Sequence, residues 1–493
     1  MRFTMVRGLV RSVRHPWVRG RRTVLAQVFL IGLLLAIGAA SAAAALGSVK
    51  TAGSPEFTFA PDRGLVDGFG GYGGQFNQHV YAKLSGPPPG LPNLETKVLA
   101  LQPQFVRIFF NTSEWTNPDR MESFLRTADL AQRAQAQINI TWQGSTFQFA
   151  MQNMDRFADV LVRILQNRQI DHVWLTLFNE PNSTRITMAQ YEQVYRLLDS
   201  ELRDRGVRDR VQFMGGDLVG SKSPLGQTQA DWFQYLAGHM GDLLDAWSIH
   251  AYWDFWDAGK IERRLLEVRS IVSSIAERRP VYVTEFGVRG IQSFEGEPET
   301  DPGFWPDGTE MAMTIVSAFQ EAWFMIRASQ LSFSATAKWD IYRAKYDNGT
   351  QDYSTIGPGV DDWPLRPSYS LLRLMGLTTQ PRGGGIVDVV ASPSADPAKR
   401  LTAYVSPAGD VTIFGLDIDG GGIATTSHAL VPYSVAGLPP NRVFRLLLWN
   451  GDGTGRDLDA GDLYSSPEGV VEFSAPLDAV FALTDTPVGP LPR

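Results

Sequence analysis

Short apolar runs alternate with longer amphipathic stretches between residues 64 and 378. Brief apolar runs predict buried strands, and an apolar residue at every third or fourth position predicts a helix with one buried face. Ile261, Leu265, Val268 and Val272 have this helical spacing. The apolar runs predict eight strands, at residues 65–69, 105–110, 137–142, 173–179, 211–215, 246–252, 281–285 and 335–341.

Eight strand and helix units in succession predict a closed barrel of parallel strands with the helices outside, the (β/α)8 or TIM barrel. We assign this α/β barrel to residues 64–380. A doubly wound open sheet is the structural alternative, because it uses the same alternation of strands and helices.

The pattern changes after "SYSLLRLM", the expected eighth helix. Short strands without helices follow, separated by turn clusters such as "NGDGTG", and they predict a C-terminal β-sandwich over residues 381–493. A supporting role for this domain is favoured over carbohydrate binding. Residues 47–63 are expected to be a linker that could add one strand to the sandwich. The predicted sandwich strands are 386–390, 401–405, 411–418, 443–449, 470–473 and 479–484.

The first 46 residues have the pattern of an export segment. Seven arginines and no acidic residue precede position 24, and the apolar run "VLAQVFLIGLLLAIGAASAAAAL" follows. This pattern predicts a signal peptide cleaved near residues 40–45, or an uncleaved membrane anchor of the same length. A buried N-terminal helix is the remaining alternative. In either of the first two cases the rest of the chain lies outside the cytoplasm, secreted or anchored to the membrane.

Composition excludes several kinds of chemistry. The chain has no cysteine, which removes disulfides, thiolate catalysis and cysteine-bound metal clusters. Its six histidines show no metal-protease spacing, so neither a metal site nor any other cofactor is expected. The net charge of −7 includes the N-terminal arginines, so the rest of the chain is more acidic still. Nucleic acid and anionic lipid are therefore disfavoured as partners, and a neutral glycan fits better.

Residues at the carboxyl ends of the strands are the candidates for a functional site, because barrel enzymes place their sites there. These positions hold the residue types of a sugar-cleaving pocket. They are Arg107, Trp142, Asn179, Glu180, His250, Tyr252, Glu285 and Trp339.

Two of these residues form a pair of carboxylates. Glu180 ends the fourth predicted strand, where Pro181 stops it, and Glu285 ends the seventh. Two such groups facing each other at about 5 to 5.5 Å suit retaining glycoside hydrolysis, in which one is the nucleophile and the other the acid and base. The nucleophile should stay ionised beside Arg107 and Tyr252. The acid should be protonated, so we expect the pKa of Glu180 to exceed that of Glu285.

The motifs at three strand ends resemble the retaining glycoside hydrolases of clan A. They are Asn179-Glu180-Pro181, His250-Ala251-Tyr252 and Thr284-Glu285-Phe286-Gly287. The "GGD" at residues 215–217 and "IHAYW" are similar to family 39, "VTEFGV" and Arg107 resemble family 5, and Trp142 is nearer to family 30.

The resemblance implies a role for each motif residue. Glu180 would be the acid and base, and Glu285 the nucleophile. Asn179 would bind the sugar 2-hydroxyl, and His250 and Tyr252 would orient the carboxylates. Clan membership implies cleavage of an equatorial bond, as in β-D-glycosides, or of α-L-arabinofuranosides. Glucan, mannan, xylan, arabinan and a cell-surface polysaccharide all remain open as substrates, as do endo and exo action.

Aromatic residues in the loops after the last three strands are expected to stack on sugar rings. They are Trp253, Phe255, Trp256, Phe304, Trp305, Tyr353 and Trp363.

Three other functions compete with hydrolysis. "GFGGYG" at residues 68–73 matches a dinucleotide-binding motif and would suggest an oxidoreductase. No helix start follows it, as such a motif requires. Its glycines are therefore expected to let a loop approach the sugar. A carbohydrate-binding protein without catalysis would not need both glutamates. A transglycosylase acting on a cell-surface glycan would use the same pair as a hydrolase.

Overall fold

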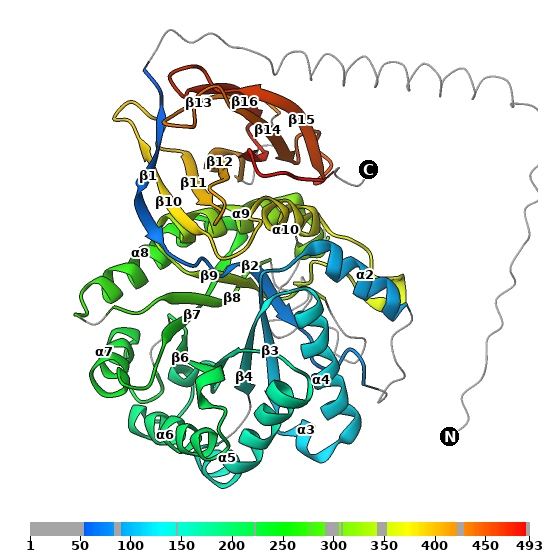
Figure 1. Cartoon of the computed structure of the whole chain (residues 1–493), viewed down its shortest axis with the longest axis vertical. Coiled ribbons are helices and arrows are strands. Elements are labelled where there is room, and N and C mark those ends of the chain that lie inside the picture. Colours follow the sequence, from blue (N-terminus) through cyan, green and yellow to red (C-terminus); the bar gives the residue numbers. More distant parts are fainter. Residues whose placement is uncertain are drawn as a thin grey trace, which may run out of the picture. The chain divides into compact units, whose positions relative to one another are not determined.

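The computed structural model describes residues 54–82, 90–143, 146–220, 223–276, 278–290, 305–306, 309–342, 353–421 and 428–489. These residues form a barrel of parallel strands and a second domain built on one large β-sheet (Figure 1). The N-terminal segment whose sequence predicts a signal peptide or an anchor lies outside the described residues. Within the described ranges, no helix combines the length and apolar character needed to cross a membrane.

Eight strands close into the barrel, and β9 pairs with β2 to complete the ring. Strand β5 is therefore the fourth barrel strand and β8 the seventh. The barrel strands are β2 (Gly71–Phe76), β3 (Phe105–Asn111), β4 (Gln137–Gln143), β5 (Val173–Leu177), β6 (Val211–Leu218), β7 (Ala246–Asp254), β8 (Val281–Arg289) and β9 (Ala335–Lys338).

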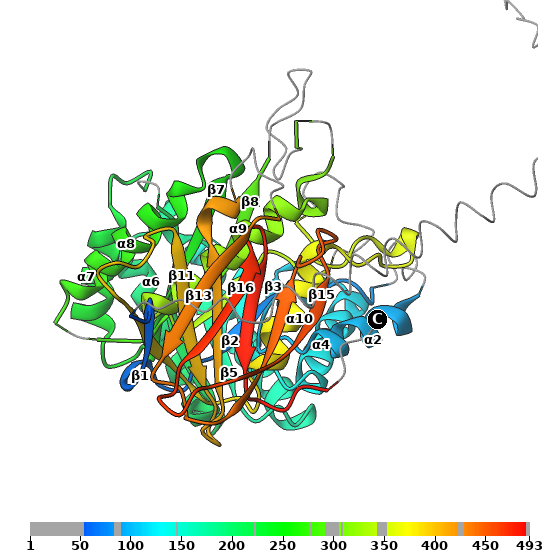
Figure 2. The same cartoon turned by 90° about the horizontal axis from the view of Figure 1, so that it is seen from above.

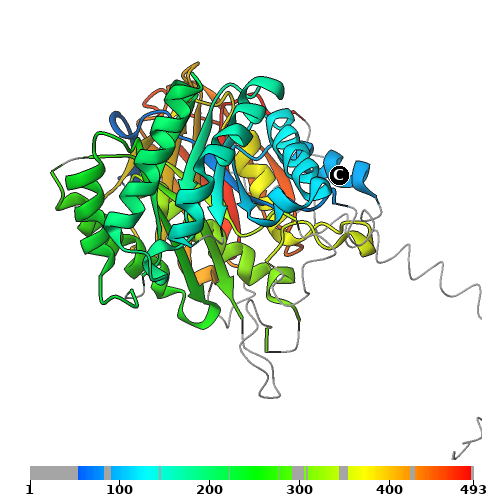
Figure 3. The same ribbon diagram turned by 90° about the horizontal axis from the view of Figure 1, so that it is seen from below.

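Helices surround the barrel, because each buries its apolar stripe against the strands. In α8, Ile261, Leu265, Val268 and Val272 are all buried, as their spacing predicts. Figure 3 shows the cyan and green helices outside the strands. The helices are α2 (Leu91–Leu101), α3 (Ser113–Thr116), α4 (Pro118–Arg133), α5 (Phe147–Val162), α6 (Met188–Asp204), α7 (Gln229–Met240), α8 (Gly259–Ser273), α9 (Ile315–Gln330) and α10 (Pro367–Thr378).

The first barrel strand is not where the apolar pattern predicts it. Residues 65–66 end a strand of the other domain, and the glycine-rich run from Gly71 forms β2 instead. A Cβ atom on Gly73 would lie 1.9 Å from the Phe105 carbonyl oxygen. The glycines therefore permit close packing of the barrel wall, rather than the approach of a loop to sugar. The boundary between the domains lies between Val66 and Gly71, not at residue 63.

The second domain is one continuous nine-stranded sheet that closes over its own apolar core. Phe481 on β17 contacts Tyr433 and Phe473 on the distant strands β13 and β16, with ring centroids 4.8 and 5.0 Å apart. The strand order is β15-β14-β17-β12-β11-β10-β1-β13-β16. The strands are β1 (Phe57–Val66), β10 (Gly385–Ala391), β11 (Lys399–Val405), β12 (Val411–Asp417), β13 (Leu430–Ala436), β14 (Val443–Trp449), β15 (Asp457–Tyr464), β16 (Val471–Pro476) and β17 (Val480–Thr484).

All six strands predicted for this domain are present, and three more join them. Strand β1 precedes the barrel in the chain yet lies in the sheet, antiparallel to β10 and parallel to β13. Figure 1 shows the blue β1 beside the yellow β10. Strand β15 is half exposed and acidic, so its apolar signal in the sequence is weak. In β13, Pro432 interrupts the apolar run.

Helices α9 and α10 make many of the contacts between the barrel and the sheet. The Arg373 guanidinium of α10 donates to both carboxylate oxygens of Asp457, at 2.5 and 2.6 Å. The Thr412 hydroxyl donates to the Thr378 carbonyl oxygen at 2.6 Å. In Figure 2 the strands of the sheet, among them the paired β13 and β16, run in front of these helices. The sheet thus covers the barrel on the α9 and α10 side.

Candidate active site

The end of β5 places the first glutamate. Strand β5 stops at Leu177, and Phe178 and Glu180 then adopt left-handed backbone conformations, with φ of 63° and 50°. Pro181 begins a short 3-10 turn. A left-handed conformation is costly for residues other than glycine, and such positions concentrate at functional sites. The chain therefore turns sharply at Glu180, and its side chain lines the cavity at the barrel mouth.

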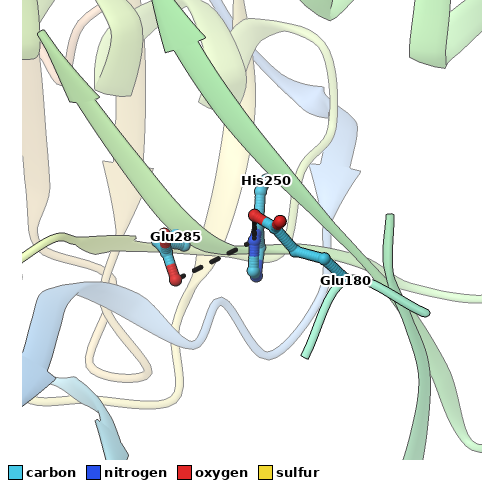
Figure 4. Close-up of side chains that lie close together, drawn as sticks. All are labelled: Glu180, His250 and Glu285. Atoms are coloured by element: carbon cyan, nitrogen blue, oxygen red, sulfur yellow. Dashed lines mark hydrogen bonds and ion pairs between the residues drawn. The ribbon is translucent and has the colours of Figure 1, made fainter. Parts of the chain in front are cut away.

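The side chains of Glu180, just after β5, and of His250 and Glu285, within β7 and β8, lie together. The His250 Nδ1 atom is 2.9 Å from Glu180 Oε1 and 3.8 Å from Glu285 Oε2. Figure 4 shows the imidazole between the two carboxylates. One side-chain oxygen or nitrogen atom of each residue lies within 4.8 Å of the others. The two carboxylates are thus close enough to act on one bond.

Arg107 anchors the polar groups beneath the cavity. Its buried guanidinium donates at 2.6 Å to Glu285 Oε2, Asn179 Oδ1 and Asp217 Oδ2. Its Nε donates to the Thr141 hydroxyl at 2.9 Å. Burial alone would lower the pKa of Arg107, but the adjacent carboxylates of Asp217 and Glu285 raise it. Arg107 is therefore a permanent cation at this position.

A bulge in β8 brings Glu285 into this network. The register pairs Ile249 with Val283 but His250 with Glu285, so Thr284 has no opposite residue in β7. An extra residue in one strand lets neighbouring side chains turn to the same side. Glu285 consequently meets Arg107, and its other oxygen accepts a hydrogen bond from the Tyr252 hydroxyl at 2.5 Å.

Asp217 is a third carboxylate that the sequence does not single out. It is fully buried, and its oxygens accept hydrogen bonds from Arg107, Ser248 and Thr284. Burial raises its pKa, but Arg107 and His250 outweigh burial and hold the pKa of Asp217 well below its usual range. A second bulge, in the pairing of β6 with β7, turns Asp217 inward with φ of 51°. The trace of this carboxylate in the sequence is the "GGD" motif at the end of a predicted strand.

The charge states of His250 and Glu180 are coupled. Burial disfavours a charged imidazole, yet Glu285 and Asp217 raise the pKa of His250 to about 9. Burial raises the pKa of Glu180, but the hydrogen bond and the charge of His250 outweigh it and lower that pKa below its ordinary value. The expectation of a raised pKa for Glu180 is therefore wrong for the free protein. The proton expected on Glu180 resides instead on its partner His250, 2.9 Å away.

The ligand types of Glu180, His250 and Glu285 would also suit a metal ion. The donor set argues against that use. Both oxygens of Glu285 already accept hydrogen bonds, from Arg107 and Tyr252. A guanidinium 2.6 Å from a ligand oxygen would also repel a cation.

The cavity has a volume of about 1080 Å³ and includes most of the predicted site residues. Asn179, Glu180, His250, Tyr252, Glu285 and Trp339 line it, and Arg107 lies directly beneath. Trp142 does not reach it. Its ring packs against Trp115 and Phe157, between the barrel and its helices. Side chains alternate along a strand, so the residue at position 142 faces outward.

The loop aromatics mostly pack the loops themselves. Among those in the described ranges, Trp253, Phe255 and Trp363 are buried in the core, and Trp305 packs on Phe255. Trp256 is half exposed, at 52%. Tyr353 lines the cavity beside Tyr252, with a ring centroid distance of 5.8 Å. Phe304 lies outside the described residues.

Comparison with solved structures finds the same fold in glycoside hydrolases. A family 51 α-L-arabinofuranosidase from Bifidobacterium longum matches with a TM-score of 0.60 and 12% identity, over 88% of this chain and 100% of that one. A family 39 enzyme from Xanthomonas axonopodis pv. citri matches with a TM-score of 0.53 and 12% identity, over 88% and 98%. The fold is one that clan A-like glycoside hydrolases use.

The likeness extends to the structure of a conserved exported protein from Bacteroides fragilis. It has a TM-score of 0.62 and 10% identity, and the match covers 87% of this chain and 99% of that one. No protein-family model and no curated protein matches the sequence. At these identities the shared feature is the fold, a TIM barrel with an accompanying β-sheet domain.

Proposed function

We propose that the protein is a retaining glycoside hydrolase that cleaves O-glycosidic bonds of an oligosaccharide or polysaccharide by double displacement. The observation that carries the proposal is the pair Glu180 and Glu285 in one cavity, with side-chain oxygens within 4.8 Å of each other. Retaining enzymes hold their carboxyl groups about 5 to 5.5 Å apart, whereas inverting enzymes leave about 6.5 to 9.5 Å for a water molecule.

In the first step Glu285 attacks the anomeric carbon as the bond to the leaving oxygen breaks. Arg107 and Tyr252 hold the Glu285 carboxylate in place through hydrogen bonds to its two oxygens. The leaving oxygen takes a proton from Glu180, which draws that proton from His250 across 2.9 Å. A glycosyl ester on Glu285 is the intermediate.

In the second step Glu180 acts as the base. It takes a proton from a water molecule, which attacks the anomeric carbon and releases Glu285 as a carboxylate. His250 then shares the recovered proton with Glu180. Because the neutral ester no longer stabilises a charged imidazole, the proton is given up readily in the first step and regained in the second.

Asn179 and Trp339 are the proposed contacts to the sugar. Arg107 donates to Asn179 Oδ1, so the amide nitrogen remains to donate to a sugar hydroxyl. Trp339 lines the cavity and is braced by Phe109, with ring centroids 5.5 Å apart. An aromatic face of this kind packs against the apolar face of a pyranose ring.

The first experiment compares product release from purified β-glucans, mannans, xylans and arabinans by the wild type and by Glu285→Gln. Hydrolysis by the wild type, with a loss of about 10⁴-fold or more in the variant, is expected for a missing nucleophile. Equal activity of the two proteins would disprove the assignment of Glu285. Adding an acceptor sugar and measuring the transferred product separates hydrolysis from transglycosylation.

A second variant tests Glu180. Glu180→Gln should lose activity on the natural glycan but keep much of the first step on aryl glycosides with acidic phenol leaving groups, since these need no proton. The glycosyl ester should then accumulate and be detected by mass spectrometry. A uniform loss on both kinds of substrate would place the acid elsewhere.

We also propose that the protein is exported. The N-terminal arginines and the apolar run that follows support this, as does the fold shared with an exported protein of Bacteroides fragilis. The test is the N-terminal sequence of the protein recovered from culture medium and from membranes. Cleavage near residues 40–45 indicates secretion, an intact segment in membranes indicates anchoring, and recovery in the cytoplasm contradicts export.

A further inference from the structure

The cavity that holds the two glutamates has a positively charged wall. Three of its cations lie on the first two turns of α8, and a fourth ends β8. Outside the glutamate pair, two acidic side chains reach the same cavity. The cations are Lys260, Arg263, Arg264 and Arg289, and the two acids are Asp257 and Glu267.

Arg264 is the buried member of this wall. Its side chain is 9% exposed, and its Nη1 donates to Gln229 Oε1 at 2.7 Å. Gln229 in turn donates to the Leu218 carbonyl oxygen at 3.1 Å, which fixes the amide. The guanidinium is therefore held in one place by Gln229 at the start of α7, as a preorganised binding group needs to be.

The charge of Arg264 is poorly compensated. Its acidic partner Glu267 lies 3.1 Å away but is 56% exposed, so water screens the pair. The Nη2 atom is buried and has no hydrogen-bond partner among the described residues. Burial lowers the pKa of Arg264 accordingly.

The surroundings leave room beside this guanidinium. Gly220 lines the cavity, and a Cβ atom there would lie 3.1 Å from Arg264 Cζ. The buried guanidinium beside this space favours an anion in the cavity.

We infer that the substrate is an acidic glycan, and that a carboxylate or a sulfate ester on a sugar in the cavity binds at Arg264, with Lys260 and Arg263 at the rim. This inference rests on the proposed hydrolase function and narrows its substrate class. A guanidinium binds such oxyanions through two parallel hydrogen bonds, which a neutral hydroxyl does not match. The acidic net charge of the chain had favoured a neutral glycan, but the cavity wall has the opposite sign.

The test compares matched polymers. Glucuronoxylan is assayed beside the same xylan after chemical reduction of its carboxyl groups, and a sulfated galactan beside its desulfated form. We expect kcat/KM to be about 10- to 100-fold higher for the charged member of one pair. A preference in the first pair identifies a carboxylate, and one in the second identifies an ester. Equal rates within both pairs would overturn the inference.

Variants test whether the preference for the charged polymer depends on the cationic residues of the cavity wall. Arg264→Gln should remove the preference for the charged polymer and change kcat/KM for the neutral one less than about 3-fold. Arg263→Gln alters an exposed residue and should reduce the preference partially without risk to folding. Arg203→Gln, on an exposed arginine of α6, is the control and should change nothing. Equal loss on charged and neutral polymers in Arg264→Gln would contradict a role in recognition.

Binding measurements distinguish a failure of this inference from a failure of the proposed hydrolase function. The Glu285→Gln protein is titrated with acid-hydrolysed glucuronoxylan oligosaccharides, with their carboxyl-reduced forms, and with oligosaccharides of the sulfated and desulfated galactan. Tighter binding of a charged form, lost in Glu285→Gln combined with Arg264→Gln, supports the subsite even if no polymer is hydrolysed. Hydrolysis without any such difference in affinity supports the hydrolase and rejects the acidic substrate.

Discussion

At the scale of single residues, the site depends on a balance of buried charges. Arg107 and His250 face Glu180, Asp217 and Glu285, and each of the five contacts at least one group of opposite charge. Buried charges are stable only when they are paired in this way. Each residue therefore sets the protonation state of its neighbours as well as its own.

His250 should make stability depend on pH. Its pKa is raised to about 9 from an ordinary value near 6.5, so its stabilisation is complete below pH 6.5 and lost as pH rises through 9. A shift of this size corresponds to about 3 kcal/mol. The pKa of Glu180 is lowered, so Glu180 stays ionised across this window.

Urea unfolding at pH 6.5, 7.5 and 9.5 measures this effect. The difference in unfolding free energy between the wild type and His250→Gln should shrink by about 3 kcal/mol from the lowest to the highest pH. A difference that does not change with pH would mean that His250 is neutral in the folded protein.

Asp217→Asn should weaken both stability and activity. The variant removes a fully buried counter-charge of Arg107, which costs about 3 to 5 kcal/mol of unfolding free energy. It should also lower the pKa of His250, because Asp217 is one of the charges that raise it.

The pKa of His250 is read from imidazole NMR signals, and the matched control is Asp209→Asn on the exposed surface. A loss of stability without any change in the pKa of His250 would limit Asp217 to a structural role.

At the scale of elements, bulges and tight strands bring these residues together. Glycine-rich β2 packs so closely on β3 that a Cβ on Gly73 would overlap the Phe105 carbonyl oxygen. We expect Gly73→Ala to destabilise the barrel by more than about 3 kcal/mol, or to prevent folding. Thermal unfolding monitored by circular dichroism tests this.

Gly238→Ala is the matched control. Gly238 lies in α7, is exposed, and a Cβ there meets nothing within 4 Å. Alanine is the better helix former by about 1 kcal/mol, so the variant should be more stable than the wild type. Similar destabilisation by both variants would show that close packing of β2 is not the cause.

The sequence predicts elements well where one apolar signal dominates. Seven of the eight barrel strands and the buried stripe of α8 lie where periodicity indicates. Strand β2 was missed because its glycines have no apolar side chains, although backbone packing needs them. Asp217 was missed as a site residue because a bulge, which leaves no periodic signal, turns it inward. Trp142 was predicted to reach the site, but it lies on the outward face of β4. Its residue type does not reveal which face of the strand it occupies.

At the scale of the whole molecule, the sheet domain and the barrel share a buried ion pair. Arg373 and Asp457 are 9% and 3% exposed and join α10 to β15. Asp457→Ala should therefore cost about 3 to 5 kcal/mol and lower the melting temperature of barrel and sheet together. Differential scanning calorimetry should show one transition for both.

The control lies on the same strand. Asp459 pairs with Arg445 at the surface and is 39% exposed, so Asp459→Ala should cost less than about 1 kcal/mol. Two separate transitions in the Asp457→Ala protein, with the barrel unaffected, would show that the domains fold independently.

The net charge of the chain illustrates what composition leaves out at this scale. A value of −7 describes the average surface, whereas recognition depends on a few side chains at one wall. Lys260, Arg263 and Arg264 follow one another closely at the start of α8, yet only the fold shows that they share a cavity with the glutamates. The positive charge of the cavity wall therefore becomes visible only in the structure.

The position of β1 has a consequence for the order of events during synthesis. Its partners β10 and β13 begin at residues 385 and 430, after the entire barrel has been made. At about 5 to 20 residues per second, the ribosome needs roughly 15 s to 1 min to reach them. During that interval β1 has no strand to pair with, so its outward backbone amide and carbonyl groups stay unpaired until the sheet domain is made.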